Sequence, residues 1–250
     1  MGNLINSMQI KEVKFNSIKE FIIYLSGHDD GKIRLFLGQM DDWPLDCKLI
    51  RVLRDSGQID DFHKIEKRIF KAFKDQYKEF HGRELNDWDL LSLGQHYGLP
   101  TRLLDWTSSP LIALWFAFEN VKGNNTDRVV FGLVVENDSM VDFQNDELFS
   151  VRFIKIFKAE PFDNRVINQE SWFSIQPPQI FGKGGDGLPN FNEYNTLNEN
   201  DDFEYFLVKF RFNNSMRKEV LEYLNKNKIN AIKVYPDLIG LCKTIEMNEL

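Results

Sequence analysis

Apolar residues recur every three or four positions in several segments of the chain, which is the period of an amphipathic helix. Ser17 and Glu20 form a capping box that predicts the start of one such helix. A long helix is predicted over Asp61–Phe80, and Asn86 predicts the cap of another that runs to Leu93. Toward the C-terminus, helices are predicted over Ser215–Asn225, capped by Ser215, and after the turn at Pro236–Leu238.

Shorter runs of alternating or continuous apolar residues predict strands. The predicted strands are Lys32–Gly38, Val129–Glu136, Val151–Phe157, Phe203–Phe212 and Ile229–Tyr235. Residues 1–16 are predicted to be a tail or an edge segment, and residues 17–250 a single domain. Because the strands and helices interleave without regular βαβ spacing, we predict an α+β fold, with a mixed or antiparallel β core and helices packed outside.

The stretch Gly94–Asn120 carries most of the unusual side chains in one strand-to-helix unit. Gly98 and Pro100 predict a rigid turn, and Ser109-Pro110 predicts the start of a buried helix. The polar and aromatic candidates that precede this helix are His96, Tyr97, Thr101, Arg102, Asp105 and Thr107. A site held by such a rigid frame is favourable for binding or catalysis.

Composition and charge narrow the possible functions. The chain has 250 residues with 42% hydrophobic content and 22 Phe, which predicts a well-packed core. Its net charge of −7 disfavours a nucleic-acid-binding surface, which normally needs a basic face. No metal-binding spacing such as CxxC or HExxH occurs, so no metal is expected. With neither a secretory segment nor a membrane-spanning apolar run, we expect a cytoplasmic protein with reduced thiols and no membrane partner.

A glycine-rich segment at Phe181–Asn190 contains the spacing G-x-G-x-x-G. A dinucleotide-binding fingerprint must leave a strand and open a helix. Here Pro189 and a polar stretch follow, so a loop is the predicted structure.

Four blocks of the sequence resemble the FRG domain family, which is named for a Phe-Arg-Gly tripeptide. They are HYGLPTRLLDWTSSPLIALWFAFEN at 96–120, FLGQMDDWPL at 36–45, NRVINQESWF at 164–173 and INAIKVYPDLIGLCKTI at 229–245. The resemblance extends from Ile18 to Ile245. In two places the chain departs from the family pattern, with Leu37 in place of the signature Arg and Ser171 in place of a Gly.

The departure at Leu37 bears directly on function. A buried Arg beside a Gly turn suits binding of a phosphate or carboxylate, because its planar guanidinium makes paired, charged hydrogen bonds. Leu37 cannot make them. Either the chain is a natural variant that lost the function, or Leu37 is a deliberate inactivating change of the kind used to express a toxic enzyme, and both explanations stay open.

The resemblance implies an ADP-ribosyltransferase-like fold and activity, an inference that rests on analogy of motif order. Those enzymes place an Arg or His on an early strand, a hydroxyl residue on a second strand, and a Glu or Gln motif on a later one. The corresponding positions in this chain are Leu37, Thr101–Thr107 and Gln169-Glu170. The implied substrate is NAD⁺, with an unknown protein or nucleic-acid acceptor.

Cleavage of the bond to nicotinamide creates an oxocarbenium-like centre that a nearby carboxylate stabilises. Asp105 or Glu170 is the expected carboxylate, although the family match falls on Gln169. Arg102, and after it Arg165, is expected to contact phosphate. The residues expected to contact the ribose or an aromatic ring are His96 and Tyr97, with Thr101 and Thr107 as further ligand contacts.

Structural alternatives accompany these roles. Arg102 and Asp105 can instead pair inside the fold, Trp106 suits the core, and His96 can cap a helix end. The expected protein is therefore an NAD⁺-using toxin or defence effector, for example in phage defence, impaired by Leu37. The alternative, which Leu37 favours, is a non-catalytic module that binds a nucleotide or a protein.

Overall fold

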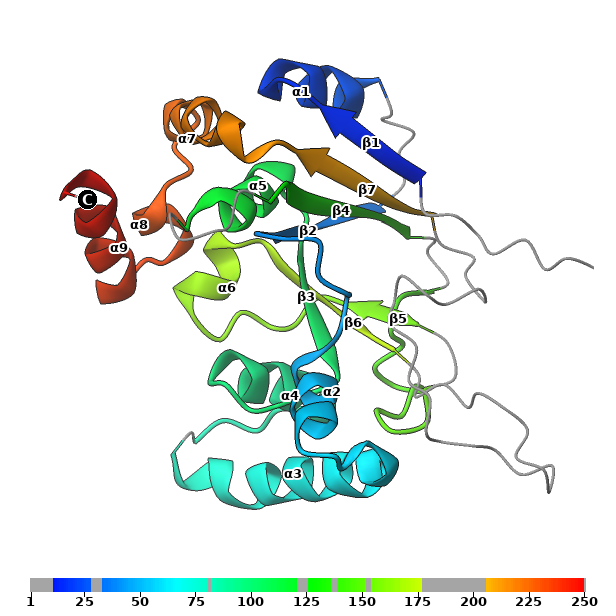
Figure 1. The fold of residues 1–250 in the computed structure, drawn as a ribbon. Helices are drawn as coiled ribbons and strands as arrows, with labels where there is room; N and C mark the ends of the chain where they lie inside the picture. Colours follow the sequence, from blue (N-terminus) through cyan, green and yellow to red (C-terminus); the bar gives the residue numbers. More distant parts are fainter. Residues whose placement is uncertain are drawn as a thin grey trace, which may run out of the picture.

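The structure, a computed structural model, describes residues 11–27, 33–80, 82–120, 126–135, 139–151, 154–176 and 206–249. Within these ranges, the strands form one seven-stranded sheet in the order β1-β7-β4-β2-β3-β6-β5 (Figure 1). The strands are β1 (Lys11–Phe15), β2 (Ile33–Gln39), β3 (Leu103–Thr107), β4 (Arg128–Val135), β5 (Lys155–Phe157), β6 (Ser171–Ile175) and β7 (Phe206–Phe212). All neighbouring strands are antiparallel except β1 and β7, which are parallel.

Helices surround this sheet, so the predicted α+β class with a mixed β core is confirmed. They are α1 (Ile18–Ser26), α2 (Lys48–Asp55), α3 (Phe62–Gln76), α4 (Asp87–His96), α5 (Pro110–Phe118), α6 (Asn164–Asn168), α7 (Arg217–Lys226), α8 (Ala231–Val234) and α9 (Leu238–Glu249). The predicted caps are present on three of them. Ser17, Asn86 and Ser109 each accept a hydrogen bond from the first turn of their helix.

The sheet has two parts that meet at one point. Strands β2 and β4 pair over seven positions, from Ile33 opposite Val135 to Gln39 opposite Val129. By contrast, β2 pairs with β3 only where Phe36 lies opposite Thr107. The part β1-β7-β4-β2 is therefore joined to the part β3-β6-β5 at a single position.

Each face of the sheet buries its own apolar layer. On β4, Val130 packs with residues of α1, α5 and α7, whereas Val129, Phe131 and Leu133 pack with residues of α2 and α3. Both faces of this strand are thus covered, which explains the nearly continuous apolar run at these positions. A third layer, with Trp88 and Phe173, lies between α3, α4 and β6.

Helix α5 lies against β2 at Gly38. A Cβ atom at this position would lie 1.8 Å from the carbonyl oxygen of Ala113 and 3.0 Å from the amide nitrogen of Ala117. Both atoms belong to the backbone of α5, so neither can move aside as a side chain would. The absence of a side chain at Gly38 is therefore what allows the helix to sit directly on the strand.

Two predictions near the C-terminus are wrong. The segment Ile229–Tyr235 contains helix α8 rather than a strand, since Asn230 caps it through the amide of Lys233 at 3.0 Å. Ala231 and Val234 are buried three positions apart, which is a helical spacing. Helix α7 begins at Arg217 rather than Ser215, because Asn213 accepts from the amide of Ser215 and holds a short turn before the helix.

Other differences are smaller. The strand predicted over Val151–Phe157 is present as Lys155–Phe157, and helix α4 continues to His96 instead of ending near Gly94. The edge segment expected in residues 1–16 includes β1, which is an edge strand of the sheet. The loop predicted at Phe181–Asn190 lies outside the described residues.

Replacement of Gly38 by Ala tests the contact between α5 and β2. We expect a loss of about 3 kcal/mol or more in the free energy of unfolding, because the added methyl group meets backbone that cannot relax. The measurement is urea denaturation. Gly27→Ala is the matched control, since a Cβ there has only ordinary contacts of 3.6 and 3.7 Å. Equal stability of the two variants would contradict the close packing.

Candidate functional site

A cavity of about 970 Å³ lies where the two parts of the sheet meet. Its wall combines β2, β3, the start of β6, helices α2, α4, α5 and α6, and the loop between β2 and α2. Six of the residues selected from the sequence line this one cavity: Leu37, His96, Asp105, Thr107, Arg165 and Gln169. Among them, Arg165 is the residue expected as the second phosphate contact.

Asp105 presents a carboxylate to the cavity. It is exposed within β3, whereas its neighbours Leu104 and Trp106 are buried. Protein nevertheless surrounds the Asp105 carboxylate on most sides, and the resulting loss of hydration raises the pKa of Asp105. A hydrogen bond from Gln95 and the positive charges around the cavity oppose this effect without cancelling it.

The Asp105 carboxylate is oriented through two other side chains. Thr101 donates to Oε1 of Gln95 and accepts a hydrogen bond from the amide of Leu103 at 3.2 Å. The Gln95 amide group then donates from Nε2 to Oδ2 of Asp105 at 2.8 Å. Thr101 is buried and does not line the cavity, so its contribution is to fix Gln95 rather than to contact a ligand.

His96 is the last residue of α4, and its side chain is held by a second carboxylate. Its Nε2 lies 2.5 Å from Oδ2 of Asp163. Asp163 in turn caps α6 by accepting from the amide of Val166 at 2.9 Å. His96 therefore bonds a fixed carboxylate at the cavity wall, which is an arrangement that orients an imidazole for proton transfer.

Helix α2 contributes three cations to the wall, namely Lys48, Arg51 and Arg54. Their spacing of three residues places them along one side of the helix. Lys48 donates to the carbonyl oxygen of Gly98 at 2.7 Å, and Arg54 pairs with Oδ2 of Asp46 at 2.6 Å. Arg51 donates to the backbone carbonyl of Asp46. These contacts fix the three cations in position, although Lys48, Arg51 and Arg54 are all exposed to solvent.

Arg165, on α6, adds a further cation. Its guanidinium lies 4.8 Å from the centre of the Tyr235 ring. Within the described part of the chain, this guanidinium makes no hydrogen bond or ion pair, so its donors are available to a ligand. Close by, Tyr235 donates to Glu119 at 3.2 Å, and Glu119 pairs with Lys243 of α9 at 3.0 Å.

The expectation that Arg102 contacts a phosphate does not fit its position. Its side chain is completely buried and does not line the cavity. It donates to Glu66 at 2.8 Å, to the carbonyl oxygen of Gln176 at 2.9 Å and to that of Leu148 at 3.2 Å. The alternative pairing with Asp105 is also wrong, since the partner is Glu66 on α3. Arg102 therefore joins three segments of the core.

Two more candidates lie outside the cavity wall. Tyr97 is 71% exposed and contacts the edge of the His96 ring. Glu170 accepts a hydrogen bond from the Ser108 hydroxyl at 2.8 Å, and its backbone has a positive φ of 49°. Glu170 thus supports the turn before β6, while Gln169 lines the cavity and donates to the carbonyl oxygen of Val234 at 3.1 Å.

The cations of α2 are not among the residues selected from the sequence. The spacing of Lys48, Arg51 and Arg54 was the available signal, since it places three charges on one side of a helix. Trp106, interpreted as a core residue, is indeed buried, and its indole nitrogen donates to Ser174 at 2.8 Å.

The arrangement is suited to an anionic ligand that also meets the carboxylate of Asp105. Cations from α2 and α6 can hold negative groups, and Asp105 faces the same space. Among the described residues, no group of three or more His, Cys, Asp or Glu side chains is placed to bind a metal ion. In the same part of the chain, every helix is too short or too polar to cross a membrane.

The ion pair between Arg102 and Glu66 can be tested by replacing one of the two residues. Burial raises the pKa of Glu66, and Arg102 opposes this effect. We expect Arg102→Met to lower the free energy of unfolding by about 3–5 kcal/mol, because an uncompensated carboxylate stays buried. Adding Glu66→Met should restore part of the loss in urea denaturation. A double variant as unstable as the sum of the two single variants would contradict this pairing.

Asp105→Asn tests the raised pKa of Asp105. A carboxyl group with a raised pKa stabilises the fold below its ordinary pKa of 3.8, and this contribution is lost as the pH rises through the folded-state value. The Asn variant should therefore melt roughly 1–2 °C higher at pH 7, a small shift because water still reaches the carboxylate. The difference should shrink toward pH 4. Asp75→Asn on the exposed side of α3 is the control, and a lower melting temperature for Asp105→Asn would contradict the expectation.

Comparison with known proteins identifies the segment that carries most of this cavity. Searches of curated proteins and of solved structures found no match, so the expected likeness to ADP-ribosyltransferases stays a prediction. A sequence model of the FRG domain matches residues 32–126, which run from β2 to beyond α5. The blocks at 164–173 and 229–245 fall outside this match. The match to the FRG domain therefore covers the segment 32–126, which carries Leu37, the α2 cations and Asp105.

Proposed function

We propose that the cavity binds a nucleotide with two phosphates, with NAD⁺ as the first candidate, and that Asp105 is the carboxylate that acts on it. The observation that carries this proposal is the presence of Asp105 and the α2 cations in one cavity wall. Each can bind a different part of such a molecule. Cations suit the pyrophosphate, and a carboxylate suits the ribose.

The size and lining of the cavity support a ligand of this kind. Its volume of about 970 Å³ is near the upper end of the usual range for small-molecule sites, which is roughly 300–1,000 Å³. Leu37, Leu103 and Phe116 supply apolar wall, on which a base or a nicotinamide ring can lie. Arg165 and Arg51 supply guanidinium groups that suit phosphate oxygens.

The reaction that fits Asp105 is cleavage of the glycosidic bond to nicotinamide. The bond breaks with its electron pair on nicotinamide, and the ribose carbon becomes an oxocarbenium-like cation. The negative charge of Asp105 stabilises that cation, while Gln95 and Thr101 keep the carboxylate oriented. Water or an acceptor group then adds to the carbon and releases a proton, for which His96 is a candidate base in the wall.

One observation favours a second function, which is binding without turnover. Leu37 lies in the cavity wall where the family has Arg, and its side chain packs against the apolar layer of β4 and α2. A charged hydrogen-bond donor is therefore missing from the strand that faces β3. With Leu37 at this position, the chain would bind a nucleotide weakly and cleave it only slowly. In its active form, with Arg at this position, it would be a toxin or defence effector that modifies an acceptor.

The variant Leu37→Arg tests the proposal. We expect it to bind NAD⁺ about tenfold more tightly than the parent chain in isothermal titration calorimetry, because a charged hydrogen bond is gained. It should also release nicotinamide faster and arrest cell growth on expression. Leu37→Gln is the control, since it adds a polar group of similar length without charge.

The double variant Leu37→Arg with Asp105→Asn separates binding from catalysis. It should keep the affinity gained from Arg but lose nicotinamide release and toxicity. Tighter binding without any turnover in Leu37→Arg would favour the binding module. Unchanged affinity, turnover and growth in Leu37→Arg would exclude a nucleotide site of the proposed kind.

A further inference from the structure

The loop Met40–Asp46, which we call the rim loop, joins β2 to α2 and carries Trp43 into the cavity wall. The Trp43 side chain is 49% exposed. Three other tryptophans, Trp88, Trp106 and Trp115, are at most 3% exposed. Exposure of a large ring at the mouth of a cavity is unfavourable in water, so Trp43 is available to cover something else.

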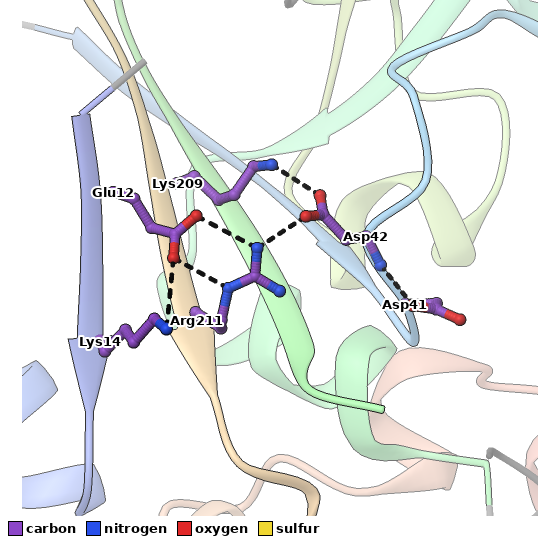
Figure 2. A network of polar contacts seen from close by, with 6 residues as sticks. All are labelled: Glu12, Lys14, Asp41, Asp42, Lys209 and Arg211. Atoms are coloured by element: carbon purple, nitrogen blue, oxygen red, sulfur yellow. Dashed lines mark hydrogen bonds and ion pairs between the residues drawn. The ribbon is translucent and has the colours of Figure 1, made fainter. Parts of the chain in front are cut away.

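Ion pairs hold the rim loop to strand β7 of the sheet. Figure 2 shows Asp42 between two cations of β7. Its Oδ1 accepts from Lys209 at 2.7 Å, and its Oδ2 accepts from Arg211 at 2.6 Å. Burial raises the pKa of Asp42, but the two hydrogen bonds lower it by more, so the carboxylate is charged at neutral pH.

Arg211 is itself held from the other side. It donates from Nε and Nη2 to the two oxygens of Glu12 on β1, at 3.0 and 3.1 Å (Figure 2). Such a paired contact fixes the plane of a guanidinium. The group that binds Asp42 is therefore not free to rotate away.

Both ends of the rim loop are tied down as well. At its start, the carbonyl oxygen of Met40 accepts from the fully buried Arg128 at 2.7 Å. At its end, Asp46 accepts from Arg51 and Arg54. Next to the tryptophan, the amide of Trp43 donates to the carbonyl oxygen of Asp41 at 2.9 Å. Cations from β4, β7 and α2 thus fix the rim loop on each side of the exposed Trp43 ring.

A rigid loop that presents a large ring to a cavity has the properties of a stacking platform, because little conformational entropy remains to be lost on binding. We propose that Trp43 is the aromatic platform on which the ring of the nucleotide stacks, and that Asp42 is a positioning residue that holds Trp43 in place. This inference rests on the proposed function, since it concerns the same cavity. It adds a determinant of ligand choice, namely that a base or nicotinamide ring is required in addition to phosphate.

Three ligands of graded size test the platform: NAD⁺, ADP and inorganic pyrophosphate. Trp43→Ala should weaken binding of NAD⁺ and ADP roughly tenfold, which corresponds to about 1.4 kcal/mol, within the usual range for stacking of a base on an aromatic side chain. Binding of pyrophosphate should not change, because it has no ring. Trp43→Phe should retain most of the affinity. Phe80→Ala, which removes an exposed ring on another part of the surface, is the matched control.

Asp42→Asn tests the positioning role without altering the ring. It should weaken NAD⁺ binding about threefold and leave pyrophosphate binding unchanged, and Trp43→Ala should mask this effect in the double variant. The control is Asp75→Asn, which removes a similar ion pair with Lys71 on the exposed side of α3. Quenching of tryptophan fluorescence by NAD⁺ gives a second readout, which Trp43→Phe should reduce.

The outcomes separate this inference from the proposed function. If the parent chain binds NAD⁺ and Trp43→Ala binds it equally well, the platform is excluded and the nucleotide site stands. If Trp43→Ala loses NAD⁺ and pyrophosphate alike, the residue supports the fold of the cavity, and stacking is excluded. If none of the three ligands binds the parent chain or Leu37→Arg, the proposed function fails and the platform fails with it.

Discussion

The direct contact between α5 and β2 is the constraint on which the site depends. Because a Cβ at Gly38 would overlap the backbone of Ala113, the helix and the strand can approach only where the side chain is absent. The same helix follows β3 after two residues, so its position on β2 also decides where β3 meets that strand. The pairing of Phe36 with Thr107, and with it the cavity between the two parts of the sheet, follows from this approach.

The three residues of the tripeptide Phe36-Leu37-Gly38 have different surroundings. Phe36 packs in the apolar layer with α5 and α7, and Gly38 is fixed by the helix backbone. Leu37 is half-buried and lines the cavity, so a change of side chain at the middle position reaches the cavity without meeting the backbone of α5. The tripeptide thus places two packed residues around one residue that faces the cavity.

Much of the fold could be predicted from local pattern. Helix caps at Ser17, Asn86 and Ser109, and the continuous apolar run of β4, depend on neighbouring residues and were correctly identified. A strand was wrongly predicted over Ile229–Tyr235, because the apolar positions of a seven-residue segment fit the period of a strand as well as that of a helix. The cap at Asn230 decides in favour of the helix. Sequence separation explains the misassignment of Arg102, since its partner Glu66 lies 36 residues away on another helix. For the same reason, Asp105 could be named as a carboxylate of interest, but not its orientation by Gln95.

The parallel pairing of β1 with β7 has a consequence for synthesis of the chain. Asp42 and its partner Arg211 are separated by 169 positions, and Glu12 lies 199 positions before the same arginine. A ribosome releases β2, α2, β3 and α5 long before β7, so the emerging chain can join α5 to β2 while Asp42 of the rim loop still lacks its partners on β7. The anchoring of Asp42 is therefore delayed until the last strand enters the sheet, and a chain truncated before β7 would present Trp43 on a less constrained loop.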